Sequence, residues 1–216
     1  MSDADELAIR RLVQDWGVWR DAGEWERFRT VWHDDGRMMA TWFQGSCDEF
    51  IRVSREGFER GARILHLLGG TSVELAGARA ISQTKMTITQ RAAVEGVECD
   101  VVCAGRFYDF FERRPGLSAG LRRLGRRSSQ PRGRWGLVLR QPIYEQDRID
   151  PVDPSASLRL DAVLLGSFPV GYRHLAYLQT GLGFTVKPDM PGLTGPEVEA
   201  LYTSGARWLA GESPER

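Results

Sequence analysis

The sequence predicts an α+β fold: a cone-shaped α+β barrel in which three N-terminal helices pack in a curved antiparallel sheet, followed by a C-terminal extension. Three observations predict it. Up to about residue 60 the apolar side chains recur at helical spacing. From about residue 63 the chain changes to long stretches rich in Ile, Val, Thr and Phe, separated by glycine-containing turns. A length of 216 residues suits one domain with additions. A sheet that curls around helices leaves a pocket between them.

The N-terminal part predicts helices in three segments. Residues 4 to about 21 carry a helical apolar stripe, and Gly23 follows as a stop signal. Residues 25–32 repeat the spacing in a short second helix, which we expect His33-Asp-Asp-Gly36 to end. Residues 37–43 then predict a strand. Ser46-Cys-Asp-Glu49 is a capping box and predicts the start of a third helix, which continues to about Arg60.

The second half predicts an antiparallel meander. Extended stretches cover residues 63–75, 78–93 and 97–113, and a further strand begins at Trp135. The arginine-rich segment 114–134 interrupts them, and we expect a flexible, solvated excursion that joins two strands rather than a site for an anionic partner. We expect one domain over residues 1–148, with residues 149–216 as an extension that packs on it and ends in a helix over 196–209.

Composition excludes several classes of partner. Lys plus Arg and Asp plus Glu balance at 29 each, so no net field attracts nucleic acid or an anionic membrane. The acidic start of the chain lacks a basic region followed by an apolar run, and no uninterrupted apolar stretch is long enough to cross a bilayer. We therefore expect a cytoplasmic protein that binds a small hydrophobic molecule. The three cysteines, at 47, 99 and 103, match neither a disulfide framework nor a metal motif.

Two polar residues stand out against apolar neighbours. Asp21 closes the Trp-rich first helix, and His66 lies inside the run Ile-Leu-His-Leu-Leu. If the two meet in a dry cavity, the carboxylate accepts the Nδ1 hydrogen and leaves Nε2 free to take a proton. The pair then forms a general base with its orienting partner. The alternative is that Asp21 is an exposed helix-end residue and His66 a satisfied core histidine.

The order of these elements resembles the SnoaL-like group of the nuclear transport factor 2 superfold. The resemblance covers roughly residues 4–148. It depends on the helix that ends in Asp21, the segment 25–36 that ends in Asp-Asp-Gly, His66 at the opening of the meander, the segment Gly-Arg-Phe-Tyr-Asp-Phe-Phe-Glu at 105–112, and Trp135 with Arg140 after it. The resemblance implies the cone fold.

The resemblance also implies roles for particular residues. In relatives such as the hexachlorocyclohexane dehydrochlorinase and scytalone dehydratase, an aspartate late in the first helix contacts a histidine at the start of the sheet, and Asp21 and His66 occupy these places. Arg140 matches a pocket arginine of the dehydrochlorinase, where its fork of donors can pull on a leaving group. The alternative for Arg140 is an ion pair with a carboxylate such as Glu145. Trp16 replaces a lysine of the dehydrochlorinase, and no histidine between His66 and His174 matches the second sheet histidine of scytalone dehydratase, so neither reaction transfers intact.

Aromatic residues supply the candidate substrate contacts. Trp16, Trp42, Tyr108 and Tyr144 are expected to line the pocket, with core packing as the alternative for each. His33 before two aspartates does not have the spacing of a metal site, and no phosphate-binding or nucleophile motif is present. We therefore expect neither metal nor cofactor.

The resemblance and the residues together predict a cofactor-independent lyase of the dehydratase type. Its expected substrate is a hydrophobic cyclic or polyketide-like molecule of secondary metabolism, with Asp21 and His66 as acid/base and Arg140 or a tyrosine stabilising the departing oxygen. A SnoaL-type cyclase, an isomerase and a non-catalytic binding module remain alternatives. We also expect a homodimer or homotrimer that associates through the outer sheet face, because residues 97–113 are aromatic on both faces of a strand.

Overall fold

The structure, a computed structural model, describes residues 3–115 and 133–212. Its strands form one six-stranded sheet in the order β2-β1-β6-β5-β4-β3. The strands are β1 (Trp32–Met39), β2 (Gln44–Ser46), β3 (Arg63–Ala76), β4 (Arg79–Val94), β5 (Val97–Arg114) and β6 (Arg134–Pro151). The helices are α1 (Asp3–Asp21), α2 (Trp25–Arg29), α3 (Cys47–Glu59), α4 (Ala162–Gly166), α5 (Arg173–Gly181) and α6 (Pro196–Leu209).

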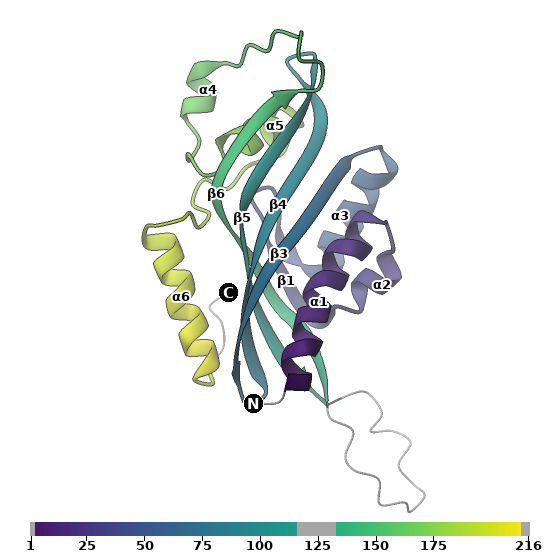
Figure 1. Ribbon diagram of the computed structural model, residues 1–216, viewed down its shortest axis with the longest axis vertical. Coiled ribbons are helices and arrows are strands. Elements are labelled where there is room, and N and C mark those ends of the chain that lie inside the picture. Colours follow the sequence, from purple (N-terminus) through teal and green to yellow (C-terminus); the bar gives the residue numbers. More distant parts are fainter. Residues whose placement is uncertain (1–2, 116–132, 213–216) are drawn as a thin grey trace, which may run out of the picture.

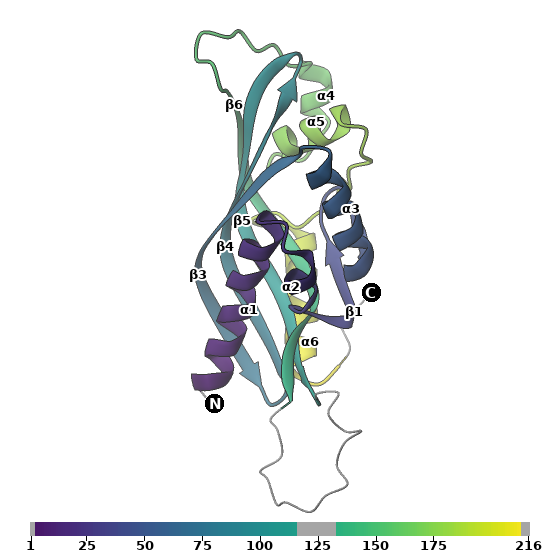
Figure 2. The same ribbon diagram turned by 90° about the vertical axis from the view of Figure 1, so that its right-hand side faces the viewer.

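The sheet is long, twisted and open, with helices on both of its sides (Figure 1). β3, β4, β5 and β6 form the predicted antiparallel meander. The helices α1, α2 and α3 lie on one side, which we call the inner face, and α6 lies on the other (Figures 1 and 2). The α+β class with a curved sheet is therefore confirmed. The sheet does not close into a barrel, because β2 and β3 are its two edges.

The hairpin turns lie where the glycines predict them. Gly77 joins β3 to β4 with a φ of 63°, and Glu95 and Gly96 join β4 to β5 with φ values of 49° and 79°. These left-handed conformations favour glycine, which explains why each turn contains one.

The second helix is shorter than the apolar spacing predicts. α2 ends at Arg29, and Trp32 begins β1, which spans residues 32–39 instead of the predicted 37–43. β1 pairs with β6 in parallel, with Trp32 opposite Leu137, so the sheet is not purely antiparallel. The register shifts between Trp32 and Arg37, and the Asp-Asp-Gly segment lies in this irregularity instead of ending a helix. Pairing with a long neighbouring strand overrides the local helical spacing here.

The third helix begins as its capping box predicts. Ser46 is extended, and its side-chain oxygen accepts a hydrogen bond from the backbone N–H of Glu49 at 3.2 Å. This bond satisfies one of the backbone donors that the first helical turn leaves without an intrahelical acceptor.

One carboxylate attaches the C-terminal extension to the sheet. Asp147 of β6 accepts hydrogen bonds from the backbone N–H groups of His174 and Leu175 at 2.6 and 2.8 Å, both in the first turn of α5. It also contacts Nδ1 of the His174 ring at 2.8 Å. The carboxylate is fully buried. It therefore fixes the start of α5 against the sheet, next to the end of the molecule that holds α4 (Figure 2).

The helix α6 covers part of the outer sheet face. A second hydrophobic cluster joins Tyr108 and Phe110 of β5 to Leu201 and Trp208 of α6. The aromatic residues on the outward face of β5 are thus buried by the chain's own last helix. They give no reason to expect association through this face, and the oligomeric state stays a prediction.

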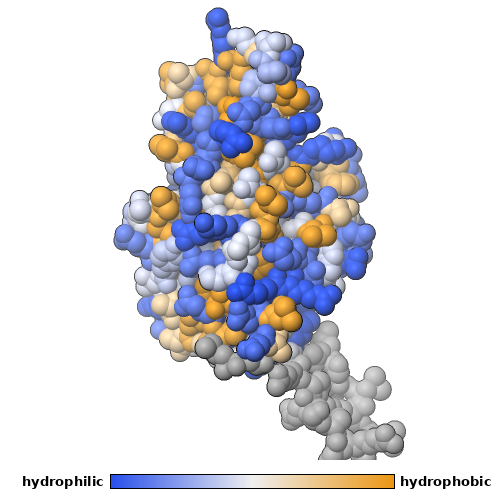
Figure 3. Space-filling view, viewed as in Figure 1, coloured by the Kyte–Doolittle hydropathy of each residue, from blue (hydrophilic) through white to orange (hydrophobic). Residues whose placement is uncertain are grey.

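The face seen in Figure 3 shows small hydrophobic areas separated by hydrophilic ones. Two leucines on the outer side of the edge strand β3, Leu65 and Leu67, are 62% and 69% exposed.

No helix of the described residues is long and apolar enough to span a membrane. Most of the predicted arginine-rich excursion 114–134, namely residues 116–132, lies outside the described part of the chain. Its two end residues belong to strands instead, because Arg114 ends β5, Arg134 begins β6 and the two lie opposite each other.

We expect Gly205→Ala to destabilise the packing of α6 on the sheet. A Cβ at this position would lie 2.0 Å from the hydroxyl oxygen of Tyr108, closer than any real contact. Overpacking of this kind costs about 1–3 kcal/mol of unfolding free energy, which urea denaturation would measure. Gly166→Ala in α4, where a Cβ meets nothing within 4 Å, is the matched control and should change stability by less than about 0.5 kcal/mol. Equal stability of the two variants would contradict the prediction.

Candidate active site

Asp21 and His66 meet on the inner face of the sheet. Nδ1 of His66 lies 2.7 Å from Oδ1 of Asp21, and the backbone N–H of His66 donates to Oδ2 at 2.5 Å. The side chain of His66 is 7% exposed and that of Asp21 is 13% exposed. The predicted contact between the two side chains is confirmed. One carboxylate holds both the backbone and the ring of the histidine, so it fixes the orientation of the imidazole.

The local sequence explains how the two residues come together. Alternate side chains of β3 point to opposite faces, so Ile64, His66 and Leu68 turn inward while their neighbours turn to solvent. α1 packs along β3 and ends at Asp21 beside His66. Gly17 on α1 permits this approach, because a Cβ there would lie 3.0 Å from the Leu68 side chain.

Burial and charge set the protonation of the pair. Burial is the largest influence on the pKa of His66 and lowers it below 6.5, although the hydrogen bond with Asp21 works in the opposite direction. Burial opposes the ionisation of Asp21, but the hydrogen bonds and charge of His66 and the charge of Arg20 outweigh it, so the pKa of this carboxyl lies below its ordinary value. At neutral pH the pair is therefore an aspartate and a neutral imidazole. Because the carboxylate accepts the Nδ1 hydrogen, Nε2 keeps its lone pair.

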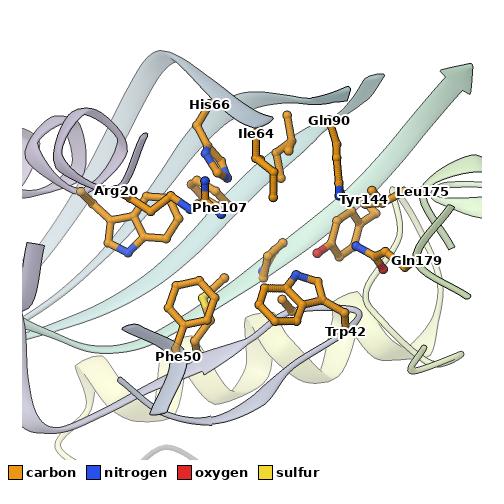
Figure 4. Close-up of a pocket in the computed structure, with 15 residues that line it drawn as sticks. Arg20, Trp42, Phe50, Ile64, His66, Gln90, Phe107, Tyr144, Leu175 and Gln179 are labelled. Carbon is orange, nitrogen blue, oxygen red and sulfur yellow. The ribbon is translucent and has the colours of Figure 1, made fainter. Parts of the chain in front are cut away.

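His66 lines a small chamber whose walls are mostly apolar (Figure 4). The chamber has a volume of about 40 Å³, room for a small functional group rather than a whole ring. It is lined by aromatic, aliphatic and a few polar side chains: Trp16, Arg20, Met38, Ala40, Trp42, Phe50, Ile64, His66, Ile88, Gln90, Phe107, Pro142, Tyr144, Leu175 and Gln179.

A larger cavity adjoins the chamber. It has a volume of about 480 Å³. It is enclosed by the end of α3, the start of β3, the end of β4 and the end of α5. Such a volume is typical of sites for small organic ligands. Five residues line both spaces and so lie at the boundary between them, which we call the passage: Arg20, Trp42, Ile64, Gln90 and Gln179. We call the larger space the outer cavity.

Three of the four predicted substrate contacts lie in the chamber. Trp16 and Trp42 form parts of its wall, and Trp16 meets the His66 ring edge-to-face at 5.2 Å between centroids. Tyr144 lines it from β6, and burial raises the pKa of its hydroxyl well above the ordinary value. The Tyr144 oxygen accepts a long bond, 3.4 Å, from the backbone N–H of Thr41, and its own hydrogen has no acceptor among the described residues.

Tyr108 lies on the opposite face of the sheet, and its predicted placement in the pocket is corrected. Its ring packs against Tyr202 of α6, with 5.5 Å between centroids, and burial raises its pKa to about 12. Alternation along β5 sends Phe107 to the chamber and Tyr108 away from it. Sequence parity alone does not say which face is inward, so it could not decide between the two.

Arg140 lies behind the chamber wall instead of lining it. Nε and one terminal nitrogen donate to the two carboxylate oxygens of Asp109, both at 2.7 Å, and both side chains are fully buried. The guanidinium carbon lies 4.2 Å from the Trp16 ring centre and 4.1 Å from that of Phe107. The predicted alternative partner, Glu145, binds Arg106 instead. Its other terminal nitrogen, Nη1, is buried without a hydrogen-bond partner among the described residues. Because Arg140 lines neither the chamber nor the outer cavity, its predicted contact with a leaving group is not supported by this geometry, and it contacts two wall residues instead.

Sequence reasoning missed three polar residues of the site. Arg20, Gln90 and Gln179 all lie at the passage between the chamber and the outer cavity. Arg20 follows Trp16 by one helical turn, a spacing that places both on one face of α1. Gln90 lies between Thr89 and Arg91 in a strand with many polar residues, so nothing in its local sequence singles it out. Gln179 comes from α5, in the extension, and nothing in its local sequence indicates a site.

The described residues offer no cluster of three or more histidine, cysteine, aspartate or glutamate side chains that could bind a metal ion. His33, next to two aspartates, instead contacts the backbone oxygen of Glu112 through Nε2 at 2.8 Å.

Comparison with known proteins identifies the family. The family model for the SnoaL-like domain matches residues 2–123, which is more than half of the chain. The chain belongs to the SnoaL-like family. Among its relatives, a PEP2-like protein and pea pathogenicity protein 2, both of Fusarium vanettenii, are 35% and 34% identical to this SnoaL-like protein. Each alignment covers 98% of the chain and 88% of the relative.

Solved structures share the fold of this SnoaL-like protein. A type 2 hexachlorocyclohexane dehydrochlorinase aligns with a TM-score of 0.53 at 14% identity, over 74% of this chain and 95% of the other. A type 3 dehydrochlorinase of Novosphingobium barchaimii aligns with a TM-score of 0.52 at 15% identity, over 73% and 96% of the two chains. The likeness at such low identity establishes the fold, of the nuclear transport factor 2 type, and not the reaction.

Proposed function

We propose that this SnoaL-like protein is a cofactor-independent lyase of the dehydratase type that acts on a hydrophobic cyclic or polyketide-like small molecule. The observation that carries the proposal is a neutral histidine, fixed by a half-buried aspartate, whose ring lines a mostly apolar chamber beside a ligand-sized cavity. The family resemblance supports an elimination, since the dehydrochlorinases that share the fold are named for one.

The proposed reaction moves one proton through His66. Nε2 removes a proton from the carbon next to a carbonyl, and the electrons of the C–H bond pass into the carbonyl to form an enolate. The hydroxyl on the adjacent carbon then leaves with its bonding electrons and takes the proton from His66 as water. A carbon–carbon double bond forms, the carbonyl is restored and His66 is neutral again. Asp21 stabilises the imidazolium during the step without taking its proton.

Tyr144 is the hydroxyl donor that suits the leaving oxygen. It lines the chamber, whereas Arg140 does not, and its hydrogen has no acceptor among the described residues. The apolar walls exclude water from the site and so strengthen the hydrogen bond from Tyr144 to the leaving oxygen.

Hydrogen–deuterium exchange tests the proposal before the product is known. The ligand that copurifies with the protein would be identified by mass spectrometry and returned to the protein in deuterated water. We expect deuterium to enter the carbon next to its carbonyl, as NMR would show, with loss of one water in the product. An isomerase or cyclase would exchange the same proton without losing water, which separates these alternatives.

A non-catalytic binding module is the second candidate. The difference in size between the two spaces favours it, because the outer cavity of about 480 Å³ can hold a ligand that never enters the chamber of about 40 Å³. A binding module predicts ligand retention with no deuterium exchange, and that result would contradict the lyase.

The pH dependence of turnover follows from the burial of His66. A general base acts only when unprotonated, and burial lowers the pKa of this histidine below 6.5. We therefore expect kcat/KM to stay constant at neutral pH and to fall only below pH 6.5. Asp21→Asn removes a group that raises this pKa, so the residual activity should fall at still lower pH. An acid limb above pH 6.5 would show that the base is a different group.

A further inference from the structure

Arg20 is a buried charge with too few partners. Arg20 is 7% exposed. Burial is the largest influence on the pKa of its guanidinium and lowers that pKa. Of its five N–H donors, one makes a hydrogen bond, from Nη1 to Oδ1 of Asp21 at 3.3 Å. Nε is buried without any hydrogen-bond partner among the described residues. Leaving a buried donor such as Nε unpaired is costly, so a group that enters the site and accepts from this guanidinium is favoured.

The partly paired guanidinium of Arg20 stands beside the proposed base. Arg20 and His66 share the same oxygen of Asp21, and both line the chamber. In Figure 4 the ends of the two side chains lie next to one another, with Tyr144 and Gln179 across the chamber. Arg20 also lines the outer cavity, so an atom of a bound ligand that passes toward His66 passes Arg20.

The charges around the chamber favour a ligand that arrives neutral. Arg20 is balanced by Asp21, and Arg140 by Asp109, while His66 is neutral. An acid would add an uncompensated negative charge to this set. A neutral ketone would not, and transfer of its proton to His66 keeps the sum at zero, because the imidazolium and the enolate form together.

We propose that Arg20 donates hydrogen bonds to the carbonyl oxygen of the substrate as it becomes an enolate, and that the substrate is a neutral cyclic ketone. The inference rests on the proposed lyase reaction. It adds to Tyr144, the donor to the leaving oxygen, a second donor that stabilises the carbonyl oxygen. The interaction strengthens as charge develops on the oxygen, which is what accelerates a reaction. Arg20, rather than Arg140, is then the arginine that contacts the substrate, and it acts on the carbonyl oxygen instead of the leaving oxygen.

The binding of naphthalene and two of its derivatives to the whole protein tests the proposal. 2-Naphthol presents an oxygen on a planar ring carbon, as an enol does; naphthalene lacks the oxygen, and 2-naphthoate carries a full negative charge. Equilibrium dialysis would measure the three affinities. We expect 2-naphthol to bind most tightly, and Arg20→Gln to weaken its binding about 10-fold or more while changing naphthalene binding by less than about 2-fold. Arg20→Lys, which keeps the charge but loses the fork, should lie between the two.

The control is Arg52→Gln. Arg52 lies on α3, is 54% exposed and pairs with Glu49 and Glu56, so its loss should change none of the three affinities. Unchanged 2-naphthol binding in Arg20→Gln would overturn the role of Arg20. Tighter binding of 2-naphthoate than of 2-naphthol by the unmodified protein would overturn the neutral ketone. The deuterium-exchange experiment tests the lyase reaction separately. If no deuterium enters the ligand while 2-naphthol binding still depends on Arg20, the lyase reaction is wrong and the binding role of Arg20 stands.

Discussion

Replacing His66 by alanine will lower turnover by about 10²- to 10⁴-fold and leave the fold in place, because the substitution removes the only proton acceptor proposed for the reaction. Asp21→Asn keeps the shape of the carboxyl but loses the charge that stabilises the imidazolium and the preference for hydrogen on Nδ1. Both variants interrupt one proton transfer, so the double variant should be little slower than the slower single variant. Steady-state kinetics on the identified ligand, with circular dichroism to verify folding, measures each loss.

The chain contains a matched control for this substitution. His174 meets Asp147 with Nδ1 at 2.8 Å from the carboxylate, and its backbone N–H contacts the same carboxylate, the arrangement that His66 has with Asp21. His174 does not line the chamber or the outer cavity. If the effect of His66→Ala arises from the position of His66 beside the chamber, His174→Ala should leave turnover within about 2-fold of that of the unmodified protein. Equal losses in both histidine variants would show that the effect is structural.

Asp109→Ala will cost the largest amount of stability, about 3–5 kcal/mol of unfolding free energy. Its carboxylate holds two nitrogens of Arg140 at 2.7 Å, and both side chains are fully buried, so the substitution leaves an uncompensated positive charge in the core. Trp16 and Phe107, whose rings contact that guanidinium, would lose their support as well. Urea denaturation measures the loss.

A double variant separates charge from packing. Asp109→Leu combined with Arg140→Met removes both charges and should recover most of the stability, because buried ion pairs are commonly replaced by apolar side chains without loss. A loss below about 1 kcal/mol in Asp109→Ala would contradict a tightly paired, dry arginine. Arg140→Lys should likewise appear mainly as lower stability, since a lysine cannot form both bonds.

Residues with local signals were predicted correctly. Ser46 caps α3 because capping depends on a few neighbouring residues, and the glycine turns of the meander follow from backbone conformation alone. Asp21 and His66 were found because each is a polar residue among apolar neighbours, and the family resemblance connected them. Trp32 was assigned to the wrong element because the competing interaction, a parallel pairing with β6, is distant in the sequence.

The details of the site depend on contacts that the sequence does not express. Arg140 was expected to meet the substrate, but its partner Asp109 lies on another strand, and only the register of β5 against β6 places them opposite each other. Tyr108 faces α6, a helix nearly a hundred residues later. Gln179 reaches the passage only because Asp147 fixes the start of α5. Each of these placements is set by tertiary packing, and local patterns do not contain it.

Nitrogen-15 NMR of the histidine side chains tests the state of the proposed base without any substrate. The chain has three histidines, so the spectrum of His66→Ala assigns the signal of interest. We expect His66 to be neutral at pH 7, with hydrogen on Nδ1 and a lone pair on Nε2, and to remain neutral as the pH falls through 6.5. A protonated His66 at neutral pH, or one with hydrogen on Nε2, would contradict its role as the base.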